Sequence, residues 1–262
     1  MEYQSARKKY RELRKIDGWF AEEAAMLLSL LNAVQKQNKI GGDLFEIGVH
    51  HGKSTLFFYH FLDEGEQLRV CDLFGNQTDN VSFSGSGNKQ KFLDNCAKYI
   101  DNESIPIFEK LSCELSIEEI GASYRMFHVD GGHSFEEALF DLKLAAQSIR
   151  EEGIIILDDP FRSEWPGVTE ALIEFLRKSP QFSALVVGFN KLILVRNTHL
   201  ETYSAVLDDV ANRTKHGLGF PWAYKTMSLA GKDLRCFYMP TSLQNPSLKL
   251  RAYSFLKRRG LK

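Results

Sequence analysis

The feature that most constrains this chain is an alternation of short apolar runs with amphipathic stretches between residues 44 and 177. Apolar runs of strand length occupy Leu44–Val49, Leu68–Leu73, Ile105–Phe108, Tyr124–Val129 and Ile154–Leu157. Stretches with helical spacing of apolar residues occupy Ser54–Leu62, Lys89–Tyr99, Phe135–Ser148 and Val168–Arg177. Strand and helix in alternation predict an α/β fold with parallel strands and helices on both faces of the sheet.

The pattern changes at both ends of this region. Two apolar runs, at 182–187 and 192–195, flank a short turn that contains Gly188, which predicts a hairpin and an antiparallel last strand. Residues 5–38 predict a helical extension, whose apolar positions from Phe20 to Val34 would either cover the active site or form a contact between subunits. We therefore divide the chain into an N-terminal helical cap (1–39), a central domain (40–198) and a C-terminal extension packed on that domain (199–262).

Charge and composition exclude several classes of function. Lys and Arg number 33 and Asp and Glu 34, so the net charge of −1 gives no general attraction for nucleic acid. No apolar run approaches the ~20 residues that a membrane helix needs. The four cysteines form no C-x-x-C pair and no zinc-like spacing with histidine, as is typical of reduced thiols in a cytoplasmic protein.

A glycine turn follows the first predicted strand, in the sequence DLFEIGVHHGKS (43–54). Gly48 and Gly52 would let a ligand approach the backbone, because no Cβ intervenes. Asp72, twenty residues beyond Gly52, ends the next strand, where a carboxylate can accept hydrogen bonds from a ribose diol. Glycine is also common in strand–helix turns for geometry alone, and an Asp after a strand is often only a cap. Together the two features favour binding of a nucleoside cofactor.

Three more carboxylates follow two further strands. Asp130 comes after the fourth apolar run, and Asp158 and Asp159 come after the fifth. All three are expected at the carboxyl edge of the sheet, where their mutual repulsion would favour a bound cation such as Mg²⁺. The alternative is structural, since Asp159 precedes Pro160 and could cap the following helix.

These residues resemble those of class I S-adenosylmethionine-dependent methyltransferases over roughly residues 40–197. Within that class the chain is similar to the branch of macrolide-sugar and aminocoumarin-sugar O-methyltransferases and a cephalosporin-pathway methyltransferase. The segment Glu46-x-Gly48-x-x-x-Gly52 resembles the family's first motif, although His50 stands where many members have glycine. The resemblance implies a Rossmann-like, mostly parallel sheet of seven strands whose last strand is antiparallel. It also implies that S-adenosylmethionine is bound by Glu46, Gly48, Gly52, Ser54, Asp72, Ser112 and Asp130.

The branch signature is the segment Asp130–His133, followed by Asp141 and by the Asp158–Asp159 pair. By resemblance to metal-dependent members, Asp130, Asp158 and Asp159 would bind one divalent metal ion. His133 lies where catechol-type O-methyltransferases have a catalytic lysine, so His133, with Asp130, is the expected catalytic residue. A histidine suits general-base chemistry near neutral pH, although His133 could instead only pack at the start of its helix.

The function expected from these features is metal-assisted O-methylation of a small hydroxylated acceptor, such as a sugar or a natural-product intermediate. A binding protein for a nucleoside cofactor, acting as a scaffold or regulator without turnover, is the alternative. A Rossmann-type oxidoreductase is disfavoured, because the G-x-G-x-x-G fingerprint is missing. The polar, glycine- and serine-rich segment 75–91 is expected to form a lid over the cofactor.

Overall fold

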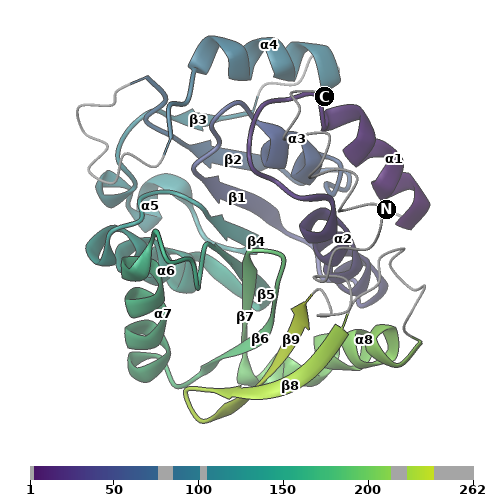
Figure 1. Cartoon of the computed structure of the whole chain (residues 1–262). Coiled ribbons are helices and arrows are strands. Elements are labelled where there is room, and N and C mark those ends of the chain that lie inside the picture. The colour runs from purple at the N-terminus through teal and green to yellow at the C-terminus, as the bar shows by residue number, and fades with distance from the viewer. Residues whose placement is uncertain (1–2, 76–84, 101–104, 214–222, 239–262) are drawn as a thin grey trace, which may run out of the picture.

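The protein is built around one nine-stranded sheet with helices on both faces (Figure 1). The computed structural model describes residues 3–75, 85–100, 105–213 and 223–238. The strands are β1 (Asp43–Ile47), β2 (Leu68–Cys71), β3 (Ile107–Phe108), β4 (Tyr124–Val129), β5 (Ile149–Asp158), β6 (Phe182–Gly188), β7 (Lys191–Arg196), β8 (Ala223–Leu229) and β9 (Lys232–Tyr238). Their order across the sheet is β3-β2-β1-β4-β5-β7-β6-β9-β8.

Strands β1 to β5 pair in parallel, and β7 joins β5 antiparallel, as the sequence predicts. The chain leaves β1 toward β2 and β3 and then returns to β4, so the strand order reverses between β1 and β4. Ligands of open α/β sheets bind at the carboxyl ends of strands beside such a reversal. The fold therefore selects one edge of the sheet for the functional site.

The predicted count of seven strands is too low for this sheet. Residues 223–238 form a hairpin whose second strand, β9, pairs in parallel with β6. The edge of β6 that faces away from β7 offers backbone groups for pairing, and β9 uses them. The C-terminal extension thus contributes two strands to the central sheet.

The helices cover the two faces of the sheet in two groups, each with its own apolar core. One face carries α1, α2, α3, α4 and α8, and the other carries α5, α6 and α7. The bounds are α1 (Tyr3–Leu13), α2 (Glu22–Gln37), α3 (Lys53–Tyr59), α4 (Lys89–Tyr99), α5 (Ile117–Ile120), α6 (Phe135–Ser148), α7 (Pro166–Lys178) and α8 (Leu200–Arg213), with short 3-10 turns η1 (Ser112–Glu114) and η2 (Asn197–His199).

The N-terminal extension forms two helices, α1 and α2, that meet at residues 14–21. The predicted apolar face is covered within the chain, since Leu27, Leu31 and Val34 are at most 3% exposed. The connection between the two helices reaches the carboxyl edge of the sheet, where Trp19 and Phe20, the first of the predicted apolar positions, line a cavity.

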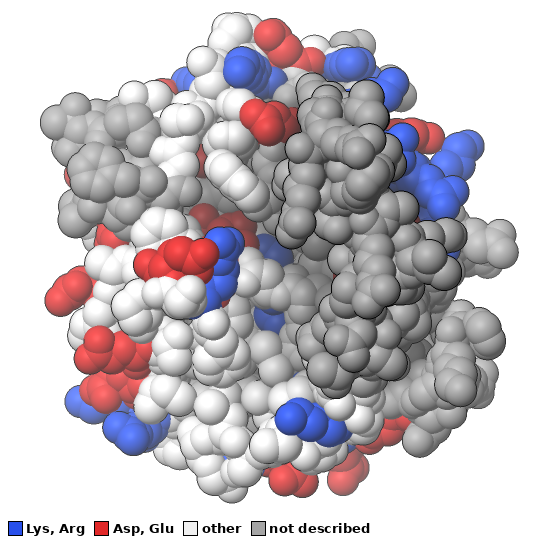
Figure 2. Space-filling view, viewed as in Figure 1, with Lys and Arg blue, Asp and Glu red and all other residues white. Residues whose placement is uncertain are grey.

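Charged side chains of both signs occur together on one face of the molecule. On the face shown in Figure 2, Lys and Arg are interspersed with Asp and Glu and form no continuous basic surface among the described residues. Among the helices that the structure describes, none is long and apolar enough to cross a bilayer. The middle of the predicted lid, 76–84, lies outside the described residues, as do residues 214–222 and 239–262 of the predicted C-terminal extension.

Candidate active site

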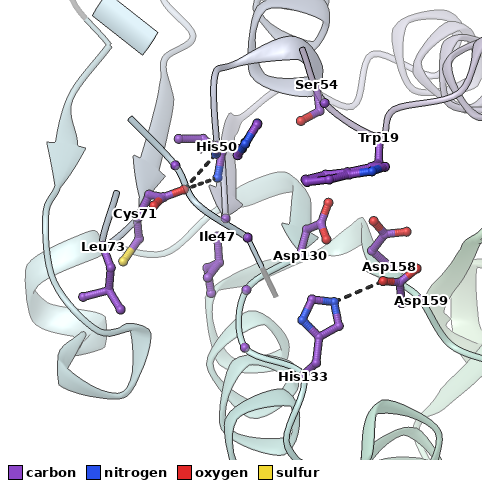
Figure 3. Close-up of a pocket in the computed structure, with 18 of the residues that line it drawn as sticks. Trp19, Ile47, His50, Ser54, Cys71, Leu73, Asp130, His133, Asp158 and Asp159 are labelled. Carbon is purple, nitrogen blue, oxygen red and sulfur yellow. Dashed lines mark hydrogen bonds and ion pairs between the residues drawn. The ribbon is translucent and has the colours of Figure 1, made fainter. Parts of the chain in front are cut away.

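A cavity of about 370 Å³ lies at the carboxyl edge of the sheet, beside the strand-order reversal (Figure 3). Its wall is formed by the β1–α3 turn, the end of β2, the β4–α6 turn, the end of β5 and the connection between α1 and α2. The volume falls in the usual range for sites that bind small molecules. Predicted site residues that line it are Gly48, Ser54, Asp72, Ser112, Asp130, His133, Asp158 and Asp159.

The two glycines of the β1–α3 turn have separate structural causes. Gly48 has φ +82°, and a Cβ there would lie 1.8 Å from the carbonyl oxygen of Asp130. The turn after β1 and the turn after β4 therefore cross in contact, which only glycine permits. Gly52 has φ +87° and begins α3, and a Cβ there would lie 2.8 Å from the ring of Phe92. Gly48 lines the cavity, whereas glycine is needed at position 52 because α4 packs against it.

Asp72 is held by the backbone of the glycine turn. Its Oδ2 accepts hydrogen bonds from the amides of Val49 at 2.6 Å and His50 at 2.9 Å. Its Oδ1 accepts one from the amide of Phe74 at 2.5 Å. An ionised carboxylate has about four acceptor positions, so capacity for a ligand hydroxyl remains. Asp72 thus ties β2 to the glycine turn while it faces the cavity.

Glu46 does not reach the cavity. Its side chain is fully buried beneath the glycine turn, where it accepts a hydrogen bond from the Thr55 hydroxyl at 2.5 Å and contacts His128 Nδ1 at 2.9 Å. Burial raises the pKa of Glu46 to about 7, against the opposing effect of the Ser54 and Thr55 hydroxyls. The structure therefore places this residue of the predicted cofactor set in an internal polar network.

Asp141 of the branch signature is also fully buried, in α6 behind the β4–α6 turn. A Cβ on Gly131 would lie 2.9 Å from its Oδ2, so the carboxyl group packs directly against that turn. Desolvation raises the pKa of Asp141 to about 7, with the Ser112 hydroxyl acting in the opposite direction. Glu46 and Asp141 thus support the cavity from opposite faces of the sheet.

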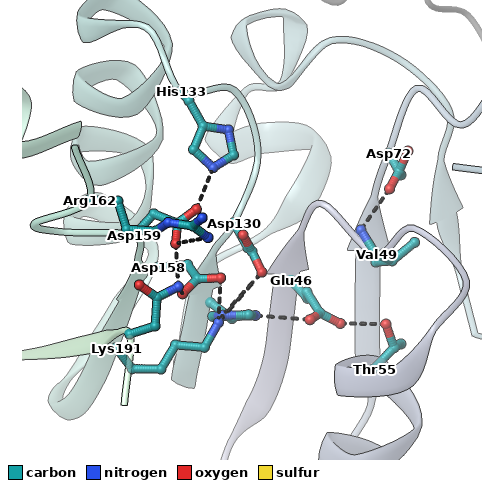
Figure 4. Close-up of polar contacts among 12 residues, drawn as sticks. Glu46, Val49, Thr55, Asp72, Asp130, His133, Asp158, Asp159, Arg162 and Lys191 are labelled. Carbon is teal, nitrogen blue, oxygen red and sulfur yellow. Dashed lines mark hydrogen bonds and ion pairs between the residues drawn. The ribbon is translucent and has the colours of Figure 1, made fainter. Parts of the chain in front are cut away.

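A buried lysine, which the sequence analysis missed, lies at the carboxylate cluster (Figure 4). Lys191 is only 3% exposed, and its Nζ lies 2.7 Å from Asp158 Oδ2 and 3.5 Å from Asp130 Oδ2. The same ammonium lies 2.9 Å from His128 Nε2. Because an ammonium can only donate, Nε2 is the acceptor and Nδ1 carries the proton that His128 donates to Glu46.

The charges in this cluster shift one another's pKa values. Desolvation lowers the pKa of Lys191, but the carboxylates of Asp130 and Asp158 outweigh it, so the net shift is upward. Burial, followed by repulsion from Asp158, raises the pKa of Asp130 well above its ordinary value. Desolvation and the nearby Lys191 hold the pKa of His128 well below its ordinary value. His128 is therefore neutral, in agreement with its acceptor role.

The neighbouring carboxylate, Asp159, has different partners. Its Oδ2 lies 3.1 Å from His133 Nε2, and its Oδ1 contacts Asn190 Nδ2 and lies 3.5 Å from Arg162 Nη1. Burial would raise the pKa of Asp159, but the hydrogen bonds from His133 and Asn190 hold it below its ordinary value. The imidazole of His133 also packs on the ring of Trp165, at 4.5 Å between centroids. His133 is thus oriented by a carboxylate and an aromatic ring.

The predicted metal set fits the structure only in part. The cluster whose ligand atoms lie within 4.8 Å of one another consists of His128, Asp130 and Asp158, without Asp159. Oxygen and imidazole ligands of this kind can hold a divalent ion. The same three side chains, however, already contact the Lys191 ammonium.

The residues that the sequence analysis missed had weak signals. Lys191 is a charge at the start of an apolar run, and His128 is a polar residue inside one. Trp19 lies at the cavity with its ring 5.1 Å from that of His50, although 75% of the residue is exposed. In Figure 3 it lies on the same side of Asp130 as Ser54, opposite His133.

Residues 45–160 match a family model described as a methyltransferase domain. No curated protein matches the chain in sequence.

Among solved structures, the O-methyltransferase NovP superposes with a TM-score of 0.54 at 15% identity, over 65% of this chain and 78% of NovP. The methyltransferase PaMTH1 of Podospora anserina, solved with S-adenosylhomocysteine, gives 0.51 at 15% identity over 72% of this chain and 86% of that protein. An O-methyltransferase of Bacillus cereus, also in complex with S-adenosylhomocysteine, gives 0.51 at 14% identity over 71% and 89%. At these identities the similarity establishes the fold. The family match over residues 45–160 adds that this part of the chain is similar to a methyltransferase domain, as in an enzyme.

Proposed function

We propose that this enzyme transfers a methyl group from S-adenosylmethionine to a hydroxyl oxygen of a small acceptor, such as a sugar or a natural-product intermediate. One observation carries the proposal: a single cavity has the glycine turn with Asp72 at one end and Asp130 with His133 at the other. We name these the cofactor end and the acceptor end. The similarity of the fold to O-methyltransferases supports the choice of oxygen as the methylated atom.

At the cofactor end, the residues fit a nucleoside. Asp72 would accept from the ribose hydroxyls, and Ser112 lies on the same cavity wall, where it could contact adenine. Gly48 leaves the backbone open to close approach, because it has no side chain. S-adenosylmethionine bound here would supply an electrophilic methyl group.

At the acceptor end, His133 and Asp130 are the two candidate bases. With His133 Nε2–H donating to Asp159, Nδ1 carries the lone pair; this atom is buried and has no hydrogen-bond partner among the described residues, so His133 would act as the base only if binding of the acceptor exposes it. Asp130 lines the cavity, and its raised pKa brings it closer to the range of a useful base. Either group would take the hydroxyl proton as the oxygen attacks the methyl carbon and the bond from that carbon to sulfur breaks, with S-adenosylhomocysteine as the leaving group. Positioning would supply much of the rate.

The sequence also predicts assistance by a divalent ion, Mg²⁺ by the chemistry of its carboxylate ligands. Asp130, Asp158 and His128 would hold it, and it would lower the pKa of the acceptor hydroxyl. The fit is incomplete, because Lys191 contacts the same side chains.

The proposed partner is thus a small molecule, and neither nucleic acid nor membrane is part of the proposal. We place the enzyme in the cytoplasm, since all four cysteines are free thiols.

The test measures cofactor binding and turnover separately. Calorimetry should show binding of S-adenosylmethionine and S-adenosylhomocysteine, and a panel of sugars and phenols should include one that releases S-adenosylhomocysteine. Binding without turnover on any acceptor would favour the scaffold alternative. Absence of cofactor binding would refute the proposed function.

A further inference from the structure

We propose that Lys191 is the resident cation of the acceptor end, and that its ammonium takes the place of the divalent metal ion predicted there. The inference rests on the proposed function only in assigning this end of the cavity to the acceptor. That an internal ammonium takes the place of an external metal ion is argued from the described side chains alone.

The first argument is geometric. The Nζ of Lys191 contacts each member of the candidate metal cluster: Asp158 at 2.7 Å, His128 at 2.9 Å and Asp130 at 3.5 Å. Figure 4 shows the lysine side chain extending to the same point as the two carboxylates. A metal ion bound by these three side chains would need the position that the ammonium now occupies.

The second argument concerns the donor atoms. The Nε2 of His128 has one lone pair, and the hydrogen bond from Lys191 uses it. The opposite ring nitrogen contacts Glu46, which also accepts from Thr55. This buried chain of hydrogen bonds fixes the ring, so the imidazole can serve the ammonium or a metal ion but not both.

The third argument is that Lys191 cannot easily leave. Its backbone pairs with Asp158 in the β5–β7 ladder, its side chain is 3% exposed, and the ring of Phe20 lies 5.8 Å from its Nζ. A divalent ion would meet a positive charge within a few ångströms in surroundings shielded from water, where like charges repel strongly. Displacement of Lys191 would also bury an ammonium without its partners.

Lys191 is accordingly a positioning residue. It holds Asp130 and Asp158 together, although their like charges would otherwise separate them, and leaves Asp130 facing the cavity. Deprotonation of the acceptor would then rely on Asp130 or His133, with no metal ion required.

The test titrates the protein with Mn²⁺ and follows the paramagnetic resonance of the free ion, without any acceptor. We expect no saturable Mn²⁺ binding that depends on Asp158 in the unmodified protein. Lys191→Met, which keeps the length of the side chain but removes its charge, should bind one Mn²⁺ at least about tenfold more tightly than the unmodified protein. The double variant Lys191→Met/Asp158→Asn should lose that gain. Lys225→Met, the same change on the exposed β8 strand, is the matched control and should bind no additional Mn²⁺.

Two results would overturn the proposal. One is a single tight Mn²⁺ site in the unmodified protein that Asp158→Asn removes. The other is a folded Lys191→Met protein, still able to bind S-adenosylmethionine, that gains no Mn²⁺ site. If Lys191→Met does not fold, the comparison of the unmodified protein with Asp158→Asn decides alone. Failure of the unmodified protein to bind S-adenosylmethionine would count against the proposed function, and it would leave the Mn²⁺ comparison valid.

Discussion

The two ends of the cavity are held by different kinds of groups, backbone amides at one end and charged side chains at the other. At the cofactor end, most contacts are made by backbone groups. Two amides of the glycine turn and one after β2 donate hydrogen bonds to Asp72, and the backbone of Gly48 packs against that of Asp130. At the acceptor end, charged side chains from β4, β5 and β7 hold one another. The first end depends on local backbone geometry, whereas the second depends on a balance of buried charges.

Substitutions at the two ends should therefore affect different steps. Damage to the cofactor end should weaken cofactor binding or the fold, because backbone contacts connect it to the sheet. Damage to the acceptor end should leave the cofactor bound but slow the transfer, because its side chains act on the acceptor.

The largest expected effect is on rate. His133→Ala should lower kcat by about 10²–10⁴-fold if His133 is the general base, and leave cofactor affinity unchanged. The loss should shrink at high pH, where hydroxide replaces the missing base. Steady-state kinetics and calorimetry check both parts, with His199→Ala in η2 as the control. An unchanged rate would assign proton removal to Asp130.

The next effect is on stability, at the point where the two ends touch. Gly48→Ala should lower the free energy of unfolding by about 3–5 kcal/mol, since it adds a clash with Asp130 to the strain of a positive φ. Gly65→Ala is a matched control, because its φ of +84° is nearly the same as the +82° of Gly48 and nothing lies within 4 Å of its Cβ. It should cost about 1–2 kcal/mol. Equal losses in urea denaturation would show that the crossing of the turns does not matter.

A smaller effect is expected on cofactor affinity. Asp72→Ala should weaken S-adenosylmethionine binding by about 1.5–3 kcal/mol, or roughly 10- to 150-fold, the range for hydrogen bonds to a charged group. Asp72→Asn separates the loss of charge from the loss of the turn's anchor, because the amide oxygen can still accept from Val49 or His50. Unchanged affinity in both variants, measured by calorimetry, would remove Asp72 from the cofactor site.

The smallest effect concerns pH and a group that belongs to neither end. The pKa of Asp141 is about 7 in the folded protein, above its value of about 4 in an unfolded chain. Between these values the folded state binds more protons, so this group's contribution to stability falls as pH rises from about 4 to 7. Asp141→Asn should therefore flatten the decline of Tm across that window, because the amide does not titrate. Parallel melting curves of the two proteins from pH 4 to 8 would contradict this assignment.

The cofactor end could be predicted from sequence because its parts are local. A strand, a glycine turn and a carboxylate at the end of the next strand lie within thirty residues, and α4, α6 and β4 match the predicted bounds to the residue. The parallel sheet and its antiparallel β7 are confirmed for the same reason, since their apolar runs are periodic. The addition of β8 and β9 to the sheet was missed because β9 pairs with β6, which is distant in sequence.

The acceptor end could be predicted only as a set of acids. The spacing of Asp130, Asp158 and Asp159 brings them to one edge, but nothing local indicates that a lysine from another strand neutralises two of them. Likewise, Glu46 belongs to a motif of the family, yet the pattern does not reveal that its carboxyl group faces Thr55 and His128. Side-chain direction depends on register and packing, which a single sequence does not specify.

The antiparallel junction between β5 and β7 has a consequence for how such a site could evolve. Because β7 runs against β5, its first residue, Lys191, pairs with the last residue of β5, Asp158. A shift of one position in a strand moves its side chains to the opposite face. One codon gained or lost in the turn at 189–190 would thus withdraw the ammonium and leave the acids unpaired. A form of the enzyme that needs an external ion and a form that does not would then differ by one inserted or deleted residue in this turn.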